Sequence, residues 1–175
     1  MNHIILIGFM GSGKTSVGHH LSEALSLPFL DTDEEIEKNS QMKITDIFSQ
    51  YGERYFRNLE TETLEKLSED QDRKVISVGG GLPVEKVNQP YLKEMGSVIF
   101  LEAKEDTLVT RLQGDTTRPM LKGADLRERI RTLMAQRQEA YDKVADFHIQ
   151  TDEKTFEEII EEIVRKMHIG GYHEI

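Results

Sequence analysis

Short apolar runs separate longer amphipathic stretches along this chain, and the two patterns alternate. Five runs of strand length are each bounded by Gly, Pro or charged residues: His3–Ile7, Pro28–Leu30, Val75–Val78, Ser97–Leu101 and Phe147–Ile149. Continuous rather than alternating hydrophobicity is typical of strands that are covered on both faces, as in a parallel sheet. We therefore expect five buried, parallel strands.

The stretches between these runs have helical spacing. Thr155–Met167 is the clearest case, because its apolar residues recur at i, i+3, i+4 and i+7 with glutamates between them. Helices are expected at Thr15–Leu25, Ile44–Tyr51, Tyr55–Leu67, Thr107–Leu112, Leu126–Val144 and Thr155–Met167. Alternating strands and helices predict an α/β fold with right-handed crossovers. No repeat or linker interrupts the pattern, so residues 1–175 are predicted to form a single domain.

Composition narrows the class of protein. The chain has 37% hydrophobic residues, and no uncharged stretch approaches the roughly 18 residues that a membrane span needs. With 22 Lys and Arg against 32 Asp and Glu, its formal net charge is −10, which argues against a nucleic-acid partner. It contains no Cys, which excludes disulfides and thiolate metal sites. We expect a cytoplasmic protein, a monomer, with neither membrane nor nucleic acid as partner.

A phosphate-binding loop follows the first predicted strand. Gly8–Thr15 reads G-F-M-G-S-G-K-T, which matches G-x-x-x-x-G-K-[ST] and leads directly into a predicted helix. Glycines let the backbone wrap around a phosphate with its N–H groups turned inward, and the helix N-terminus adds positive potential. Lys14 can reach the β- and γ-phosphates, and the Thr15 hydroxyl can ligate Mg²⁺. The loop predicts a nucleoside triphosphate as ligand but does not identify the acceptor.

Two carboxylates follow the second predicted strand. Asp31 and Asp33 are spaced i, i+2, so on a continuing strand they would point the same way, one toward a metal and the other toward a substrate hydroxyl. An equally weighted alternative is a helix start, because Asp33-Glu34-Glu35 suits an N-cap and an acidic first turn.

Two further features are ambiguous by themselves. Arg57 and Glu60 lie at i, i+3 on one helical face, where an ordinary surface ion pair would also fit. Gly79–Gly81 follows a buried strand, and three glycines suit a main chain that approaches a ligand closely, or simply a sharp turn.

Taken together, these motifs resemble the shikimate kinase family over nearly the whole chain. The resemblance rests on Gly8–Thr15, the F-x-D-x-D-x-x-I-E element Phe29–Glu37, the G-E-x-x-F-R-x-x-E element Gly52–Glu60, Gly79–Gly81, the segment Arg118–Leu121, and the R-x-x-x-Y-x-x-x-A-D element Arg137–Asp146. Two positions depart from it: Met120 stands where the family commonly has Leu, and the variable loop Thr151–Thr155 does not allow Lys154 to be assigned.

The resemblance implies a P-loop kinase fold of the nucleoside-monophosphate-kinase type, a five-stranded parallel sheet in the order 2-3-1-4-5 flanked by helices, with a mobile lid at about residues 114–125. It implies ATP as co-substrate, Mg²⁺ as cofactor and shikimate as acceptor. The implied ATP-binding residues are Gly11, Ser12, Gly13, Lys14, Thr15, Ser16, Arg111 and Arg118; the acceptor-binding residues are Asp33, Arg57, Glu60, Gly79, Gly80, Gly81 and Arg137; the metal residues are Thr15 and Asp31; and the catalytic residues are Asp33, Lys14 and Arg118.

The expected activity is ATP-dependent phosphorylation of the shikimate 3-hydroxyl, a step toward chorismate and the aromatic amino acids. A net charge of −10 makes fixed arginines necessary to hold a small carboxylate, for which the planar guanidinium suits better than Lys. Two alternatives stay open here: a related small-molecule kinase, such as one acting on gluconate, and a nucleotide-binding module that transfers nothing.

Overall fold

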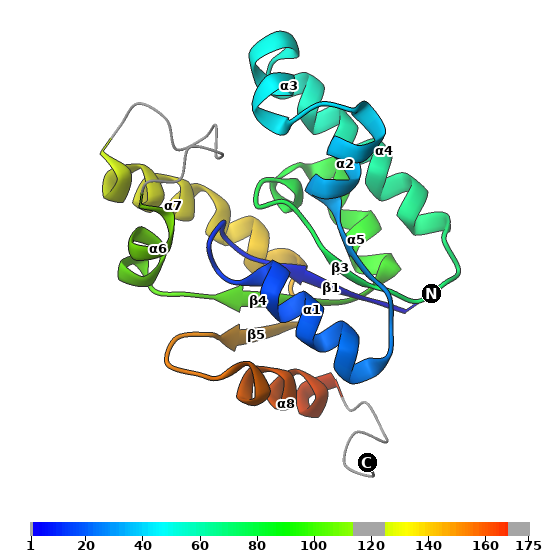
Figure 1. The fold of residues 1–175 in the computed structure, drawn as a ribbon, viewed down its shortest axis with the longest axis vertical. Coiled ribbons are helices and arrows are strands. Elements are labelled where there is room, and N and C mark those ends of the chain that lie inside the picture. The colour runs from blue at the N-terminus through cyan, green and yellow to red at the C-terminus, as the bar shows by residue number, and fades with distance from the viewer. Residues whose placement is uncertain (1, 114–124, 168–175) are drawn as a thin grey trace.

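One five-stranded parallel sheet organises the computed structural model, which describes residues 2–113 and 125–167. Its order is β2-β3-β1-β4-β5, as predicted. The strands are β1 (His3–Ile7), β2 (Phe29–Asp31), β3 (Val75–Ser77), β4 (Gly96–Glu102) and β5 (Phe147–Gln150). Each neighbouring pair is parallel. Figure 1 shows the sheet edge-on through the middle of the molecule, with helices on both sides.

Helices lie between successive strands, and the last helix follows β5. They are α1 (Lys14–Leu25), α2 (Thr32–Ser40), α3 (Ile44–Tyr51), α4 (Glu53–Glu69), α5 (Gln89–Met95), α6 (Glu105–Leu112), α7 (Leu126–Val144) and α8 (Phe156–Met167), with 3₁₀ turns η1 (Leu82–Val84) and η2 (Lys86–Asn88) before α5.

The alternation of side chains along β1 divides the core into two layers. Ile5 and Ile7 pack with residues of α4, α5 and α7, whereas Ile4 and Leu6 pack with residues of α1 and α8. All four are fully buried. This accounts for the continuous hydrophobicity of the strand, because both of its faces are covered by helices.

One helix was not expected: residues 89–95 form α5, which is too short for its apolar spacing to stand out. Residues 32–40 form α2, which confirms the alternative of a helix start after the second strand. The second strand is Phe29–Asp31 rather than Pro28–Leu30. Among the described residues, no helix is long and apolar enough to cross a membrane. The predicted lid, about 114–125, falls almost wholly outside the described residues.

Candidate active site

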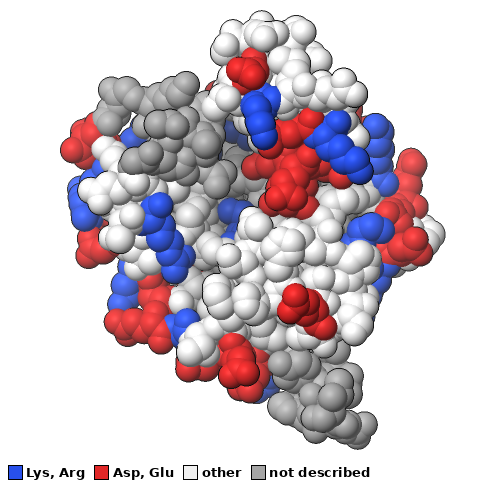
Figure 2. Space-filling model, viewed as in Figure 1, with Lys and Arg blue, Asp and Glu red and all other residues white. Residues whose placement is uncertain are grey.

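Three strands end in register at the same edge of the sheet. Leu6 pairs with Ser77, and Ser77 pairs with Asp31. The residues that follow these positions in β1, β3 and β2 therefore emerge side by side, at the carboxyl edge where parallel α/β sheets bind ligands. A cavity of about 600 Å³ opens there. In Figure 2 this face is hollowed near its centre, with acidic side chains gathered along one side of the hollow.

The loop after β1 has the conformation that its glycines allow. Gly11 and Gly13 have positive φ values of 81° and 95°, which side chains disfavour. A β-carbon on Gly8 would lie only 2.6 Å from the carbonyl oxygen of Leu101. The Lys14 ammonium donates to the carbonyl oxygens of Gly8 and Phe9, at 2.7 and 3.1 Å. Residues 10–17 line the cavity, so Gly11–Ser16 lie where the sequence placed a triphosphate.

Asp31 caps a helix and also faces the cavity. It is the N-cap of α2, since its Oδ1 accepts from the backbone N–H of Glu34 at 3.1 Å. Its Oδ2 lies 3.5 Å from the Thr15 hydroxyl of the phosphate loop. The cap therefore uses one oxygen and the other faces the cavity.

The expectation that Asp31 and Asp33 share one face of a strand is wrong. The chain leaves β2 at Asp31 and turns into α2, so Asp33 lies in the first helical turn. Both aspartates still line the cavity, because the turn brings Asp33 over the end of β3, where its Oδ1 approaches Gly79.

Arg57 and Glu60 form a buried pair rather than a surface one. Arg57 Nη1 donates to Glu60 Oε1 at 2.6 Å, and Nη2 lies 3.4 Å from Oε1 of Glu53. Glu60 is 0% exposed and Arg57 is 6% exposed. Burial raises the pKa of Glu60 to about 7, although the Arg57 guanidinium opposes this. Burial lowers the pKa of Arg57, but the attraction of Glu60 and Glu53 outweighs it, and the pKa ends above its ordinary value.

Gly79–Gly81 are glycines because charged side chains fill the space that β-carbons would need. A β-carbon at Gly79 would lie 2.8 Å from oxygens of both Asp33 and Glu60. At Gly80 it would lie 2.8 Å from Arg137 Nη1, and at Gly81 it would overlap the Arg57 guanidinium. These three residues, the glycine strip, thus bring the two arginines and two carboxylates together in one wall of the cavity.

Arg137 reaches this wall from α7, far away in sequence. It is 4% exposed, and its guanidinium lies over the ring of Phe9, 5.4 Å from the centroid. Tyr141, one turn later, donates to the carbonyl oxygen of Gly80. Burial raises the pKa of Tyr141 to about 12, so it acts as a neutral donor.

Two residues that sequence reasoning did not select also shape the site. Thr32 is fully buried, and its hydroxyl accepts from the backbone N–H of Gly79 at 3.1 Å, which joins α2 to the glycine strip. Asn88 links α4 to the backbone just after these glycines, through hydrogen bonds with Thr61 and Leu82. A single polar residue beside a strand end carries no recognisable signal, so neither could have been found from the sequence.

Arg111 also lines the cavity, next to the phosphate loop. Its Nη1 donates to the carbonyl oxygen of Gly11 at 2.8 Å. Thr151, Lys154 and Phe156 are further lining residues. The predicted residue Arg118 lies outside the described residues.

Comparisons with known proteins show the family to which the chain is similar. A model of the family described as shikimate kinase matches residues 10–168. Shikimate kinase of Thermodesulfovibrio yellowstonii is 43% identical over 166 residues, 95% of each chain, and that of Sulfurihydrogenibium sp. is 42% identical over 95% of this chain and 98% of its own.

Solved structures give the same result. Shikimate kinase from Acinetobacter baumannii in complex with shikimate superposes with a TM-score of 0.91 at 33% identity, covering 96% of this chain and 93% of that one. A gluconokinase from Sinorhizobium meliloti has a TM-score of 0.61 at 19% identity, covering 95% and 91%, a likeness that shows a shared fold alone.

Proposed function

The chain belongs to the shikimate kinase family, and we propose that it transfers the terminal phosphoryl group of ATP to the 3-hydroxyl of shikimate, giving shikimate 3-phosphate and ADP in the route to aromatic amino acids. One observation carries the proposal: Arg57, Arg137 and Asp33 line the same cavity as the phosphate loop. Such a site can hold a small hydroxylated carboxylate within reach of a nucleotide's γ-phosphate.

Arg57 and Arg137 bind the acceptor carboxylate in this proposal. Both guanidiniums are buried and face the glycine strip, and planar, bidentate groups suit a carboxylate. Glu60 orients Arg57 through the 2.6 Å ion pair. The absence of β-carbons on the glycine strip leaves the space in which these side chains and the substrate meet.

The phosphate loop binds the ATP phosphates. Backbone N–H groups of Gly11–Ser16 and the N-terminus of α1 supply positive potential, and Lys14 has to exchange its contacts with Gly8 and Phe9 for phosphate oxygens. Arg111 packs against the nucleotide on the adenine side. Arg118, outside the described residues, is assigned to the phosphates from the family resemblance.

The residues at the junction of the two substrates fit a magnesium ion. The Thr15 hydroxyl and Asp31 Oδ2 lie 3.5 Å apart in the cavity wall, and Mg²⁺ prefers oxygen ligands, usually one or two from the protein together with phosphates and waters. When bound, Mg²⁺ would neutralise charge on the β- and γ-phosphates.

Asp33 orients the 3-hydroxyl and accepts its proton as the phosphoryl group is transferred. Positioning and charge stabilisation dominate such reactions, because the transition state is loose and the hydroxyl proton leaves late. Lys14 and Arg118 stabilise the charge on the transferring group.

A coupled assay of ADP release tests the proposal. We expect ADP release that requires shikimate and does not occur with gluconate or with ATP alone. Lys14→Ala should abolish useful turnover and leave the protein folded, because the loop is built from backbone and the lysine supplies the charge that stabilises the phosphates. Tm should fall only modestly, through loss of the hydrogen bonds to Gly8 and Phe9. Gluconate-dependent ADP release, or none with any acceptor, would contradict the assignment.

We propose, finally, that the protein is a monomer in the cytoplasm and that residues 1–175 act as one domain. Net charge of −10 keeps copies apart. Light scattering at several protein concentrations tests the monomer.

A further inference from the structure

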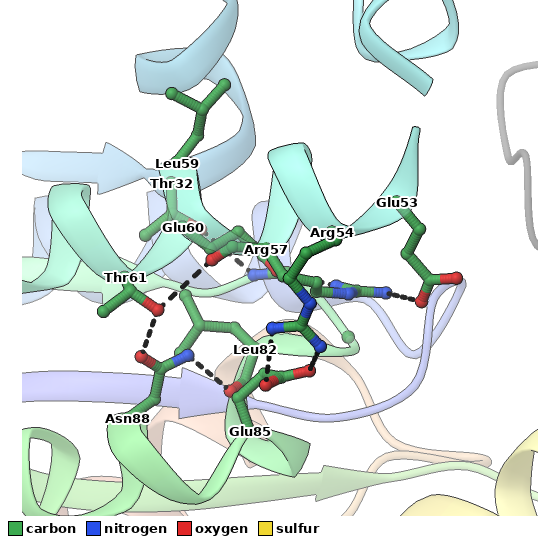
Figure 3. Close-up of polar contacts among 12 residues, drawn as sticks. Thr32, Glu53, Arg54, Arg57, Leu59, Glu60, Thr61, Leu82, Glu85 and Asn88 are labelled. Atoms are coloured by element: carbon green, nitrogen blue, oxygen red, sulfur yellow. Dashed lines mark hydrogen bonds and ion pairs between the residues drawn. The ribbon is translucent and has the colours of Figure 1, made fainter. Parts of the chain in front are cut away.

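A buried amide outside the cavity connects the two halves of the proposed acceptor site. Asn88, at the end of η2, is fully buried. Its Oδ1 accepts from the Thr61 hydroxyl at 2.8 Å, and its Nδ2 donates to the carbonyl oxygen of Leu82 at 3.0 Å. Figure 3 shows this amide between α4 and the backbone that follows the glycine strip.

Thr61 places the other end of this connection on the turn of α4 that carries the acceptor arginine. Its hydroxyl lies 3.2 Å from the backbone carbonyl oxygen of Arg57 as well as 2.8 Å from Asn88. A hydroxyl has a single hydrogen to donate, so the two oxygens share it. The amide of Asn88 therefore bridges the Arg57 turn and residue 82.

The position of residue 82 matters because the glycine strip is fixed to it. The N–H of Leu82 donates to the carbonyl oxygen of Gly79 at 3.1 Å, and the N–H of Val84 donates to that of Gly81 at 3.2 Å. Gly81 lies so close to the Arg57 guanidinium that no β-carbon would fit between them. A shift of η1 relative to α4 would move the strip directly against or away from the guanidinium.

A second link between the same elements is exposed. Arg54 of α4 donates two hydrogen bonds of 3.2 Å to Glu85, and its side chain is 70% exposed. Exposed ion pairs restrain geometry weakly, because water can replace either partner. A buried amide that loses its hydrogen-bond partners has no water to replace them, so breaking its hydrogen bonds costs more free energy. The Thr61–Asn88 link is therefore the stronger restraint.

We infer that Thr61 and Asn88 are positioning residues for the phosphoryl acceptor: together they hold the Arg57 guanidinium and the Gly79–Gly81 strip at the separation that receives the acceptor carboxylate. The inference rests on the proposed function. The pair touches no substrate, so its effect passes through Arg57 and the strip.

The test compares variants that differ by a single hydroxyl or amide. Thr61→Val removes the hydroxyl and keeps the shape, whereas Thr61→Ser keeps the hydroxyl. Asn88→Ala removes the bridge. Gln89→Ala is the matched control, because Gln89 is also buried and its amide donates to the carbonyl oxygen of Pro83 at 3.1 Å within the same segment. KM for shikimate and for ATP, kcat and Tm are measured for each.

We expect Thr61→Val and Asn88→Ala to raise the KM for shikimate about fivefold or more, since small displacements of positioning groups have large effects, with the KM for ATP unchanged within about twofold. Thr61→Ser should behave as wild type. Gln89→Ala should lower Tm without raising the KM for shikimate. The double variant should be no worse than Asn88→Ala alone, because both changes break one bridge.

The outcomes distinguish the proposed function from the positioning role of Thr61 and Asn88. If the wild type releases no ADP with shikimate, the proposed function fails and this inference with it. If the wild type is active and Thr61→Val has the shikimate KM of Thr61→Ser, or if Gln89→Ala raises that KM as much as Asn88→Ala, the positioning role alone is refuted. Thr61→Val carries the test should Asn88→Ala fail to fold.

Discussion

The two arginines proposed to bind the acceptor differ in their surroundings, although both are almost fully buried. Arg57 is paired with Glu60 at 2.6 Å. Arg137 Nη1 has no hydrogen-bond acceptor among the described residues and lies against Gly80. A buried guanidinium hydrogen without an acceptor is costly, and a bound carboxylate would remove that cost. Replacing the two residues should therefore have different effects on the free energy of unfolding.

Replacing either arginine by Ala should weaken shikimate binding about 10- to 100-fold, because a charge-assisted contact contributes roughly 1.5–3 kcal/mol. Arg57→Ala should also lower the free energy of unfolding, since it leaves the Glu60 carboxylate buried without its partner. Arg137→Ala should not. Lysine at either position should restore little. Calorimetric titration together with urea unfolding separates the effects, and wild-type shikimate affinity in both alanine variants would refute the acceptor assignment.

In the proposed site, Asp33 and Asp31 face different substrates. We expect Asp33→Asn to lose most of kcat with ATP affinity nearly unchanged, because Asp33 lies against Gly79 and Glu60 on the acceptor side. Asp31→Asn, the matched comparison, should weaken the dependence on Mg²⁺, since Asp31 faces Thr15. Titration with ATP in each variant distinguishes them, and a collapse of ATP affinity in Asp33→Asn would exchange the two roles.

Glu60 should make stability depend on pH. Its pKa is about 7 in the folded protein, above its ordinary 4.5, so the folded state keeps a proton that the unfolded state has lost. The resulting stabilisation is complete below about pH 4.5 and disappears as the pH rises through 7. Between these limits the wild type should lose about 1–3 kcal/mol more unfolding free energy than Glu60→Gln, which does not titrate. Parallel curves for the two proteins in urea unfolding would contradict this.

At the scale of elements, the glycine strip after β3 shows that a glycine can be required by neighbouring side chains rather than by its own backbone. Gly79, Gly80 and Gly81 are absent from the glycines with positive φ among the described residues. Gly52, at the start of α4, is the opposite case: its φ is 85°, and its β-carbon would have no atom within 4 Å among the described residues other than its chain neighbours.

These two cases give a paired prediction. Gly81→Ala should displace the Arg57 guanidinium and raise the KM for shikimate at least tenfold, because the β-carbon would overlap the guanidinium. Gly52→Ala should cost about 1 kcal/mol or more of stability through backbone strain, with the KM for shikimate little changed. Steady-state kinetics and thermal unfolding of both variants check this. Equal effects on KM would mean that the strip has no special contact with Arg57.

Elements specified by local sequence were predicted best. The phosphate loop and the helix after it follow from a contiguous run of residues, and β1 and α7 have the expected bounds. The α2 helix was left open because Asp31 serves as its cap and also as a residue of the cavity, and sequence spacing cannot separate two uses of one carboxylate. The burial of Arg57 with Glu60 was equally beyond reach, since an i, i+3 pair has the same pattern on a surface.

At the scale of the whole molecule, the proposed substrates lie between elements that the sequence places far apart. The acceptor side draws on α2, α4, the exit of β3 and α7, whereas the nucleotide side draws on the β1–α1 loop and α6. Arg137 and Gly80 meet although they lie 57 positions apart in the chain. A ligand that bridges these elements should therefore stabilise the fold as a unit.

Thermal unfolding measures that coupling. A ligand that binds only the folded state at 100 times its Kd adds about 2.7 kcal/mol of stability, which for a protein of this size corresponds to a rise in Tm of about 5–10 °C. We expect shikimate to produce this shift in the wild type. At the same concentration the shift in Arg137→Ala should be about half as large or smaller, because a 10- to 100-fold weaker affinity lowers the ratio of ligand concentration to Kd. The Tm of the unliganded variant should stay close to that of the wild type. Gln89→Ala, with the acceptor site intact, should start from a lower Tm and still show the full shift. An equal shift in Arg137→Ala and the wild type would mean that shikimate stabilises the protein from somewhere other than the wall formed by α4, α7 and the glycine strip.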